Sequence, residues 1–140
     1  MFKITLFTIG KTKELWLEEA LSVYLKRLKS QCTIEFILTK DDHHLGLLAS
    51  KKDHAICLDP LGASLSSEEF STFLLKELEK GGSNLAFIIG GPNGLPESFK
   101  EKFPLLSFSK MTFTHQMMRL LLVEQIYRAL EINKGTSYHK

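Results

Sequence analysis

The sequence feature that most restricts the fold is a run of five apolar residues, Leu85 to Ile89, which leads directly into the turn Gly90-Gly91-Pro92-Asn93-Gly94. A strand without alternating polar residues must be covered on both faces, as are the strands of a parallel sheet between two layers of helices. Neighbouring parallel strands need crossover connections of about a dozen residues or more, usually helical. The rest of the chain must therefore alternate strands with helices.

This alternation is visible along the whole chain. Apolar residues at helical spacing cover Leu15 to Leu28, and Ser66 or Ser67 is placed to cap a helix that ends at Gly81 and Gly82. The polar connection from Lys40 to Lys52 has room for one or two weak helical turns. The strand patterns are Phe2 to Ile9, Cys32 to Leu38, His54 to Leu58 (closed by Asp59, Pro60 and Gly62), Leu85 to Ile89, and Leu105 to Phe108. We therefore predict an α/β fold: a single domain, residues 1–140, with a mainly parallel sheet flanked by helices.

The last helix has the clearest boundaries and an unusual surface. Thr112 or Thr114 caps its start, it ends near Lys134, and Gly135 stands where a left-handed C-cap is preferred. Within it, Met117 to Val123 reads MMRLLLV and is apolar on nearly all sides except at Arg119. Such a helix must be covered on two faces. One face meets the sheet. The other either meets a second copy in an isologous homodimer or is wrapped by the chain itself.

Composition excludes several classes of protein. With 44% hydrophobic and 24% charged residues the chain is a folded globular protein, and no apolar run approaches the ~20 residues that cross a bilayer. The N-terminus lacks a basic leader, so we expect a cytoplasmic protein. Cys32 and Cys57 lie in apolar strand-like runs and are expected to be buried free thiols. His43 and His44 lack further ligands at metal spacing, so a solvated loop is expected there and no metal site.

Charge distribution leaves the kind of partner open. The formal net charge is only +2, but Lys110 to Lys140 holds five Lys or Arg residues against two acids. That excess suits contacts with phosphates, and a solvated helix face with a basic tail explains it equally well.

Three strand ends carry the residues on which a ligand site depends. They are the turn that begins at Gly90, the segment Cys57 to Gly62, and the segment Leu106 to Phe113. Ligands of open α/β sheets bind at the carboxyl ends of strands, and three loops of this composition form an apolar slot suited to an adenosine. The glycine spacing is neither GxGxxG nor a P-loop, and Pro92 removes an amide that a phosphate would need. From spacing alone, a tight turn without a ligand is equally acceptable.

The segments FIIGGPNGL and LSFSKMTFTHQMMRLLLVEQIYRALEINKGTSYHK, with CLDPLG and the opening KITLFTIGK, resemble the RlmH family of SPOUT-superfamily methyltransferases. The resemblance implies transfer of a methyl group from S-adenosylmethionine to N3 of a pseudouridine in 23S ribosomal RNA. It also implies a homodimer that acts on the ribosome, and a C-terminal trefoil knot, which is a rare topology. Two departures are that TKDDHHLGLLASKKDH is shorter than the family's helical segment, which puts one helix in doubt, and that Thr114 replaces a common Pro.

Roles for individual residues follow from the resemblance. His139 is the expected general base, because the imide proton calls for a group with a pKa near 7, and His115 is the other histidine considered. Tyr138 and Arg119 complete the expected catalytic group. Arg128, Lys140 and His115 are expected to contact RNA, although Arg128 is also placed to pair with Glu124 four residues earlier. The implied cofactor-binding residues are Leu58, Gly90, Phe108, Ser109, Lys110, Met111, Thr112 and Phe113.

Two other functions remain open at this point. One is methylation of transfer RNA by the same chemistry. The other is a ribosome-binding α/β module that performs no chemistry and has no affinity for the cofactor.

Overall fold

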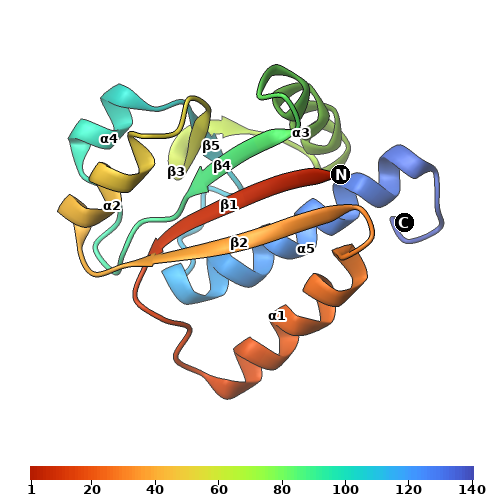
Figure 1. The fold of residues 1–140 in the computed structure, drawn as a ribbon, viewed down its shortest axis with the longest axis horizontal. Coiled ribbons are helices and arrows are strands. Elements are labelled where there is room, and N and C mark those ends of the chain that lie inside the picture. Colours follow the sequence, from red (N-terminus) through yellow and green to blue (C-terminus); the bar gives the residue numbers. More distant parts are fainter.

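The computed structural model describes residues 1–140 as one α/β domain built on a five-stranded, all-parallel sheet (Figure 1). The strands lie in the order β2-β1-β4-β3-β5. They are β1 (Phe2–Ile9), β2 (Cys32–Thr39), β3 (Ala55–Ser64), β4 (Asn84–Ile88) and β5 (Leu105–Ser107). The helices are α1 (Leu15–Leu28), α2 (Asp42–Ala49), α3 (Ser67–Lys80), α4 (Glu97–Lys102) and α5 (His115–Lys134). The predicted fold class is confirmed. No helix combines the length and apolar character needed to span a membrane.

Alternate residues of the central strands point into two separate cores. Leu85, Phe87 and Ile89 face the larger core, which α1, α3 and α5 cover. Ala86 and Ile88 face the smaller core, which α2 and α4 cover. Because both faces of β4 are buried, its sequence has no polar alternation, as the apolar run predicts.

Caps at the predicted positions fix where the long helices begin and end. The Ser66 hydroxyl accepts the Glu69 N–H and the Glu69 carboxylate accepts the Ser66 N–H, which is a complete capping box for α3. Thr114 caps α5 by accepting the Met117 N–H at 3.1 Å. Gly135 ends α5 with a φ of 74°, in the left-handed region that glycine tolerates best. The helix boundaries were therefore predictable from local chemistry.

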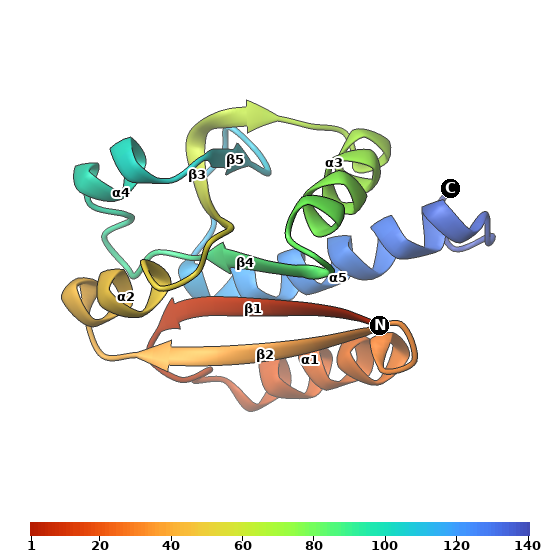
Figure 2. The same ribbon diagram turned by 45° about the horizontal axis from the view of Figure 1, so that its top comes forward.

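Three local features differ from the prediction or settle a doubt. β3 does not close at Asp59 but continues to Ser64, with a register shift between Leu58 and Ala63. Pro60 lies in this irregular stretch, where its missing N–H costs no ladder bond, and the strand bends there (Figure 2). The doubtful helix is present as α2, so His43 and His44 lie on a helix and not in a loop. α4 was not predicted, because six residues are too short to show a helical period.

The two cysteines match the prediction. Cys32 and Cys57 are buried and unpaired, and burial raises the pKa of each thiol to about 12. Both thiols therefore stay protonated and serve as small apolar core residues.

Candidate cofactor site and C-terminal tail

A cavity of about 660 Å³ opens at the carboxyl ends of β4 and β5 and beside the irregular stretch of β3 that begins at Leu58. Its wall comes from that stretch, from the loops that follow β4 and β5, and from the first turns of α1 and α5. This is where a parallel sheet places a ligand, since the strand ends leave backbone groups and loop side chains facing a common crevice. The three strand ends singled out in the sequence all contribute to it.

Seven of the eight implied cofactor-binding residues line this cavity: Leu58, Gly90, Phe108, Ser109, Met111, Thr112 and Phe113. Lys110, the eighth, is exposed and does not line it. His115 also lines the cavity, at the start of α5. The structure therefore brings together residues separated by more than fifty positions in the sequence.

The glycine turn after β4 forms a tight backbone wall. Gly91 and Gly94 pair across the turn, and the Gly94 N–H donates to the Gly91 carbonyl at 3.0 Å. A Cβ atom on Gly90 would lie 2.8 Å from the carbonyl carbon of Gly94, closer than real Cβ contacts allow. Gly90 is therefore needed for the turn to close, as well as for any close approach by a ligand.

The loop between β5 and α5 is shaped by its serines and presents apolar side chains. The Ser107 hydroxyl donates to the Ser109 carbonyl at 2.9 Å, and the Ser109 hydroxyl accepts the Met111 N–H at 2.9 Å. Met111 is 74% exposed and Phe113 is 41% exposed, and Trp16 on the opposite wall is 54% exposed. Large apolar groups exposed together around a cavity indicate a surface that is covered when the protein works.

Arg119 is fully buried and does not line the cavity. Its guanidinium donates to the carbonyls of Ile9 and Gly10 at 2.9 and 2.8 Å and to the Thr12 hydroxyl at 3.0 Å. It therefore fixes the turn after β1. Burial lowers the pKa of Arg119, and its Nε has no partner.

His115 is the histidine at the cavity. Burial lowers its pKa, and the positive charges of Arg119 and Lys13 lower it further. A neutral imidazole is therefore favoured there, which is the form that accepts a proton.

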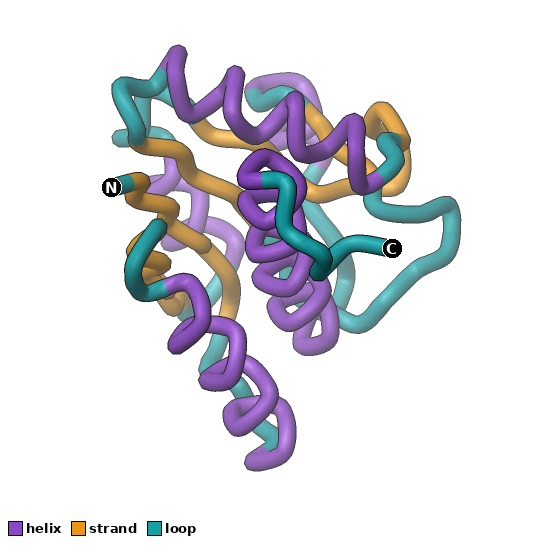
Figure 3. Tube along the Cα trace, turned by 90° about the vertical axis from the view of Figure 1, so that its right-hand side faces the viewer, coloured by secondary structure: helices purple, strands orange, loops and turns teal.

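The C-terminal tail is folded back over the end of α5 (Figure 3). The Tyr138 hydroxyl donates to Glu124 at 2.9 Å, and its ring packs edge-on against Tyr127. Burial, and then the bond to Glu124, raise the pKa of Tyr138. Arg128 forms the expected pair with Glu124, with Nη2 3.1 Å from Oε2. The tail is thus tied to its own helix and lies outside its own cavity.

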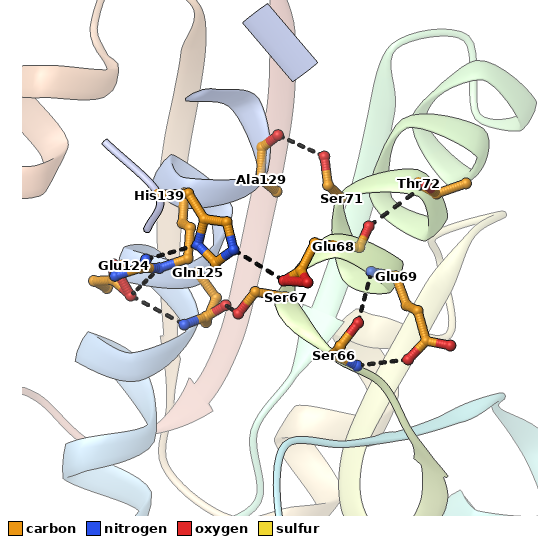
Figure 4. Close-up of polar contacts among 11 residues, drawn as sticks. Ser66, Ser67, Glu68, Glu69, Ser71, Thr72, Glu124, Gln125, Ala129 and His139 are labelled. Carbon is orange, nitrogen blue, oxygen red and sulfur yellow. Dashed lines mark hydrogen bonds and ion pairs between the residues drawn. The ribbon is translucent and has the colours of Figure 1, made fainter. Parts of the chain in front are cut away.

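His139 is held between two charged side chains (Figure 4). Its Nδ1 lies 3.0 Å from Arg128 and its Nε2 lies 2.9 Å from Glu68 on α3. Arginine can only donate, so Nδ1 accepts and Nε2 donates to the carboxylate. Both ring nitrogens are therefore engaged, and the lone pair of Nδ1 faces the Arg128 guanidinium. Lys140 is exposed beside it.

Sequence reasoning missed several residues of this region. Trp16 was not singled out in the sequence but lines the cavity, Glu68 on α3 contacts His139 of the tail, and Gln125 on α5 contacts Ser67. Only the Glu124–Arg128 spacing gave a local signal. The Glu68–His139 and Ser67–Gln125 contacts join residues more than fifty positions apart, for which a single sequence shows no pattern. No cluster of three potential metal-ligand side chains occurs in the structure.

The parallel sheet and the cavity at its strand ends define an α/β domain whose cavity, with its backbone loops and apolar walls, is of the kind that suits an organic ligand. The chain belongs to the SPOUT methyltransferase family: a family model described as "Predicted SPOUT methyltransferase" matches residues 2–139. The glycine turn after β4 and the loop before α5 therefore belong to a methyltransferase domain.

Individual relatives cover the full chain. A protein of Protochlamydia amoebophila named ribosomal RNA large subunit methyltransferase H is 50% identical over 140 residues, the whole of both chains. Proteins of the same name from Symbiobacterium thermophilum and Clostridium botulinum are 38% and 41% identical and cover 99% and 98% of this chain. Those two alignments extend over 160 and 157 residues, so these relatives contain residues that this chain lacks, in agreement with its shortened connection.

Proposed function

We propose that this protein methylates N3 of a pseudouridine in 23S ribosomal RNA on the assembled ribosome, with S-adenosylmethionine as the methyl donor. The observation that carries the proposal is the cavity of about 660 Å³ lined by seven of the eight residues that the family resemblance implies for the cofactor. The shared name of the relatives supports ribosomal RNA as the substrate. A ribosomal substrate also agrees with the expected cytoplasmic location.

The cavity fits the cofactor by size and by chemistry. Its volume falls within the range of about 300–1,000 Å³ that small-ligand pockets have. Leu58, Met111 and Phe113 offer apolar walls to an adenine ring, and the Gly90 turn admits close backbone approach. When bound, S-adenosylmethionine supplies an electrophilic methyl group on its sulfonium.

The protein's own groups must align the acceptor and remove one proton. As N3 of the base forms its bond to the methyl carbon, the bond from that carbon to sulfur breaks, and the imide proton passes to a histidine. Alignment supplies much of the rate in such an in-line displacement. Within one chain, His115 is the histidine that lines the cavity. In this proposal, His139 and Tyr138 act in the cavity of a second subunit.

A homodimer is part of the proposal. α5 keeps Met117, Leu120 and Leu121 partly exposed, and the exposed Trp16 and Phe113 lie near its start. A second copy that packs on this face covers these apolar groups and brings a second tail toward the cavity. Leu121→Lys should then give a monomer by light scattering, because Leu121 is partly exposed and its replacement leaves the core intact. Leu122 is fully buried, so Leu122→Lys should unfold the chain instead.

The remaining expected roles are proposed on the same basis. Arg119 acts by holding the turn after β1, and Arg128 and Lys140 contact RNA once the tail leaves its resting position. The trefoil knot is proposed from membership of the SPOUT family alone.

The test is methyl transfer from labelled S-adenosylmethionine to assembled ribosomes, free 23S RNA and transfer RNA in parallel. We expect label in a single 23S nucleotide of assembled ribosomes. Label in transfer RNA alone would indicate that transfer RNA is the substrate. Calorimetry without heat above background up to millimolar cofactor would instead favour a ribosome-binding module without chemistry.

A further inference from the structure

A second, smaller cavity of about 200 Å³ adjoins the first. The two share Ser107, Phe108 and Phe113 in their walls, so a ligand in one lies next to a ligand in the other. The far wall of the small cavity comes from the start of α3 and the middle of α5, with Leu65, Phe70 and Leu121 as its apolar part. No charged side chain lines it, so it suits a neutral ring and not a phosphate.

The size of this cavity limits the ligand further. Its volume equals that of about seven molecules of liquid water, at roughly 30 Å³ each. That is room for one six-membered ring with its exocyclic oxygens. A single pyrimidine base fits this limit.

Gln125 is the polar group of the cavity whose orientation is fixed. Its Nε2 donates to Glu124 at 3.0 Å, and its Oε1 accepts the Ser67 hydroxyl proton at 2.8 Å (Figure 4). A carboxylate can only accept, so the amide nitrogen must face Glu124 and the amide cannot be flipped. Glu124 is itself held by Arg128 and by Tyr138 of the tail. Glu124 and Ser67 are therefore the positioning residues for this amide.

The fixed amide keeps one free acceptor position and one free donor position. An amide oxygen has two lone pairs and an amide nitrogen two hydrogens, and Gln125 uses one of each within the chain. Adjacent acceptor and donor groups match a base edge that presents an N–H beside a carbonyl. In pseudouridine, N1–H and the C2 carbonyl form such an edge next to N3. In uridine, N1 carries the sugar and has no hydrogen.

We propose that the small cavity holds the acceptor base and that Gln125 reads the N1–H and C2 carbonyl of pseudouridine, leaving N3 directed at the cofactor cavity. The inference rests on the proposed function and adds a residue that selects pseudouridine over uridine. A site built to bond a substrate N–H disfavours the analogue that lacks it, because its own polar group is then left unpaired.

The test compares two ribosome preparations, one with pseudouridine and one with uridine at the target position. Wild-type protein should prefer pseudouridine by roughly 5- to 150-fold in kcat/KM, the range expected for one bidentate contact. Gln125→Leu keeps the bulk of the side chain but removes both polar groups, and its preference should fall to within about threefold, with cofactor affinity unchanged. Gln31→Leu is the matched control, since Gln31 contacts Glu131 away from both cavities and should keep the full preference.

The possible outcomes separate failure of this inference from failure of the proposed function. Full preference in Gln125→Leu overturns the inference, as does equal use of both ribosomes by the wild type, and both leave the proposed methylation standing. If the wild type labels neither preparation, the proposed function itself fails. If Gln125→Leu changes the dimer mass and not the preference, a second subunit fills the cavity and the inference is wrong. Should Gln125→Leu fail to fold, Ser67→Ala releases the amide on one side, and an unchanged preference there also overturns the inference.

Discussion

The buried Arg119 offers the most direct test of how this structure is held together. Replacement by Met keeps a long, unbranched side chain but removes all three hydrogen bonds to Ile9, Gly10 and Thr12. An acceptor left without a partner costs about 1–3 kcal/mol, and these three groups lie at a partly exposed turn, so about 1 kcal/mol each applies. Removing a buried charge offsets part of the loss, as the lowered pKa of Arg119 indicates. We expect Arg119→Met to destabilise the fold by about 2 kcal/mol.

Urea unfolding measures this directly. With a typical slope of about 2 kcal/mol per molar urea, the midpoint should fall by about 1 M. Arg119→Lys keeps the positive charge, but one ammonium group cannot reach all three acceptors that the planar guanidinium bonds. The unfolding midpoint of Arg119→Lys should therefore lie between those of the wild type and Arg119→Met. Lys134→Met on the same helix removes only a half-exposed ammonium from Glu131, which keeps its hydrogen bonds with Gln31 and Thr136, and should change the stability by less than about 0.5 kcal/mol.

The same variant tests whether Arg119 positions the cofactor site. Ile9 also supports the glycine turn, since its Cδ1 lies 3.1 Å from where a Cβ of Gly91 would be. A displaced turn after β1 should therefore weaken cofactor binding about tenfold, by about 1.4 kcal/mol. A midpoint within about 0.2 M of that of the wild type would refute the stability argument. Lower stability with unchanged cofactor affinity would refute the positioning argument.

Three further predictions concern the turn, the histidine and the tail. Gly90→Val should reduce cofactor affinity more than about tenfold and also lower the melting temperature, since its Cβ meets the Gly94 backbone. In Gly91→Ala the new Cβ meets only the Ile9 side chain, so cofactor affinity and melting temperature should both change little. The pKa of His115 is lower in the folded chain than the ordinary 6.5, so its contribution to stability is complete above pH 6.5 and is lost as the pH falls through the folded pKa. In His115→Gln, the stability measured by urea unfolding should therefore depend less on pH on the acid side. Wild-type and variant profiles that run parallel would contradict this. Deletion of residues 138–140 should abolish methyl transfer to ribosomes while sparing the dimer mass and cofactor binding in calorimetry, and transfer at the full-length rate would leave His115 as the base.

Much of the fold could be predicted because its signals are local. The apolar Leu85 to Ile89 run requires a strand covered on both faces, and Ser66, Thr114 and Gly135 act within four residues of themselves. The ligand loops were predictable for a related reason. Parallel strands place their carboxyl ends at one edge of the sheet whatever their order, so the three strand ends had to meet.

The tertiary structure decided which side chains those loops and helices bring together. Arg119 stands in an apolar helix segment, and nothing in its neighbours shows that it reaches back more than a hundred positions to the carbonyls of Ile9 and Gly10. The packing of α5 beside α1 decides that contact, because it brings Arg119 to the end of β1. Glu68 and His139 meet, and Gln125 meets Ser67, only because α3 packs beside α5. Such contacts depend on long-range packing, which a single sequence does not display, whereas caps, turns and buried strands follow from the chemistry of adjacent residues.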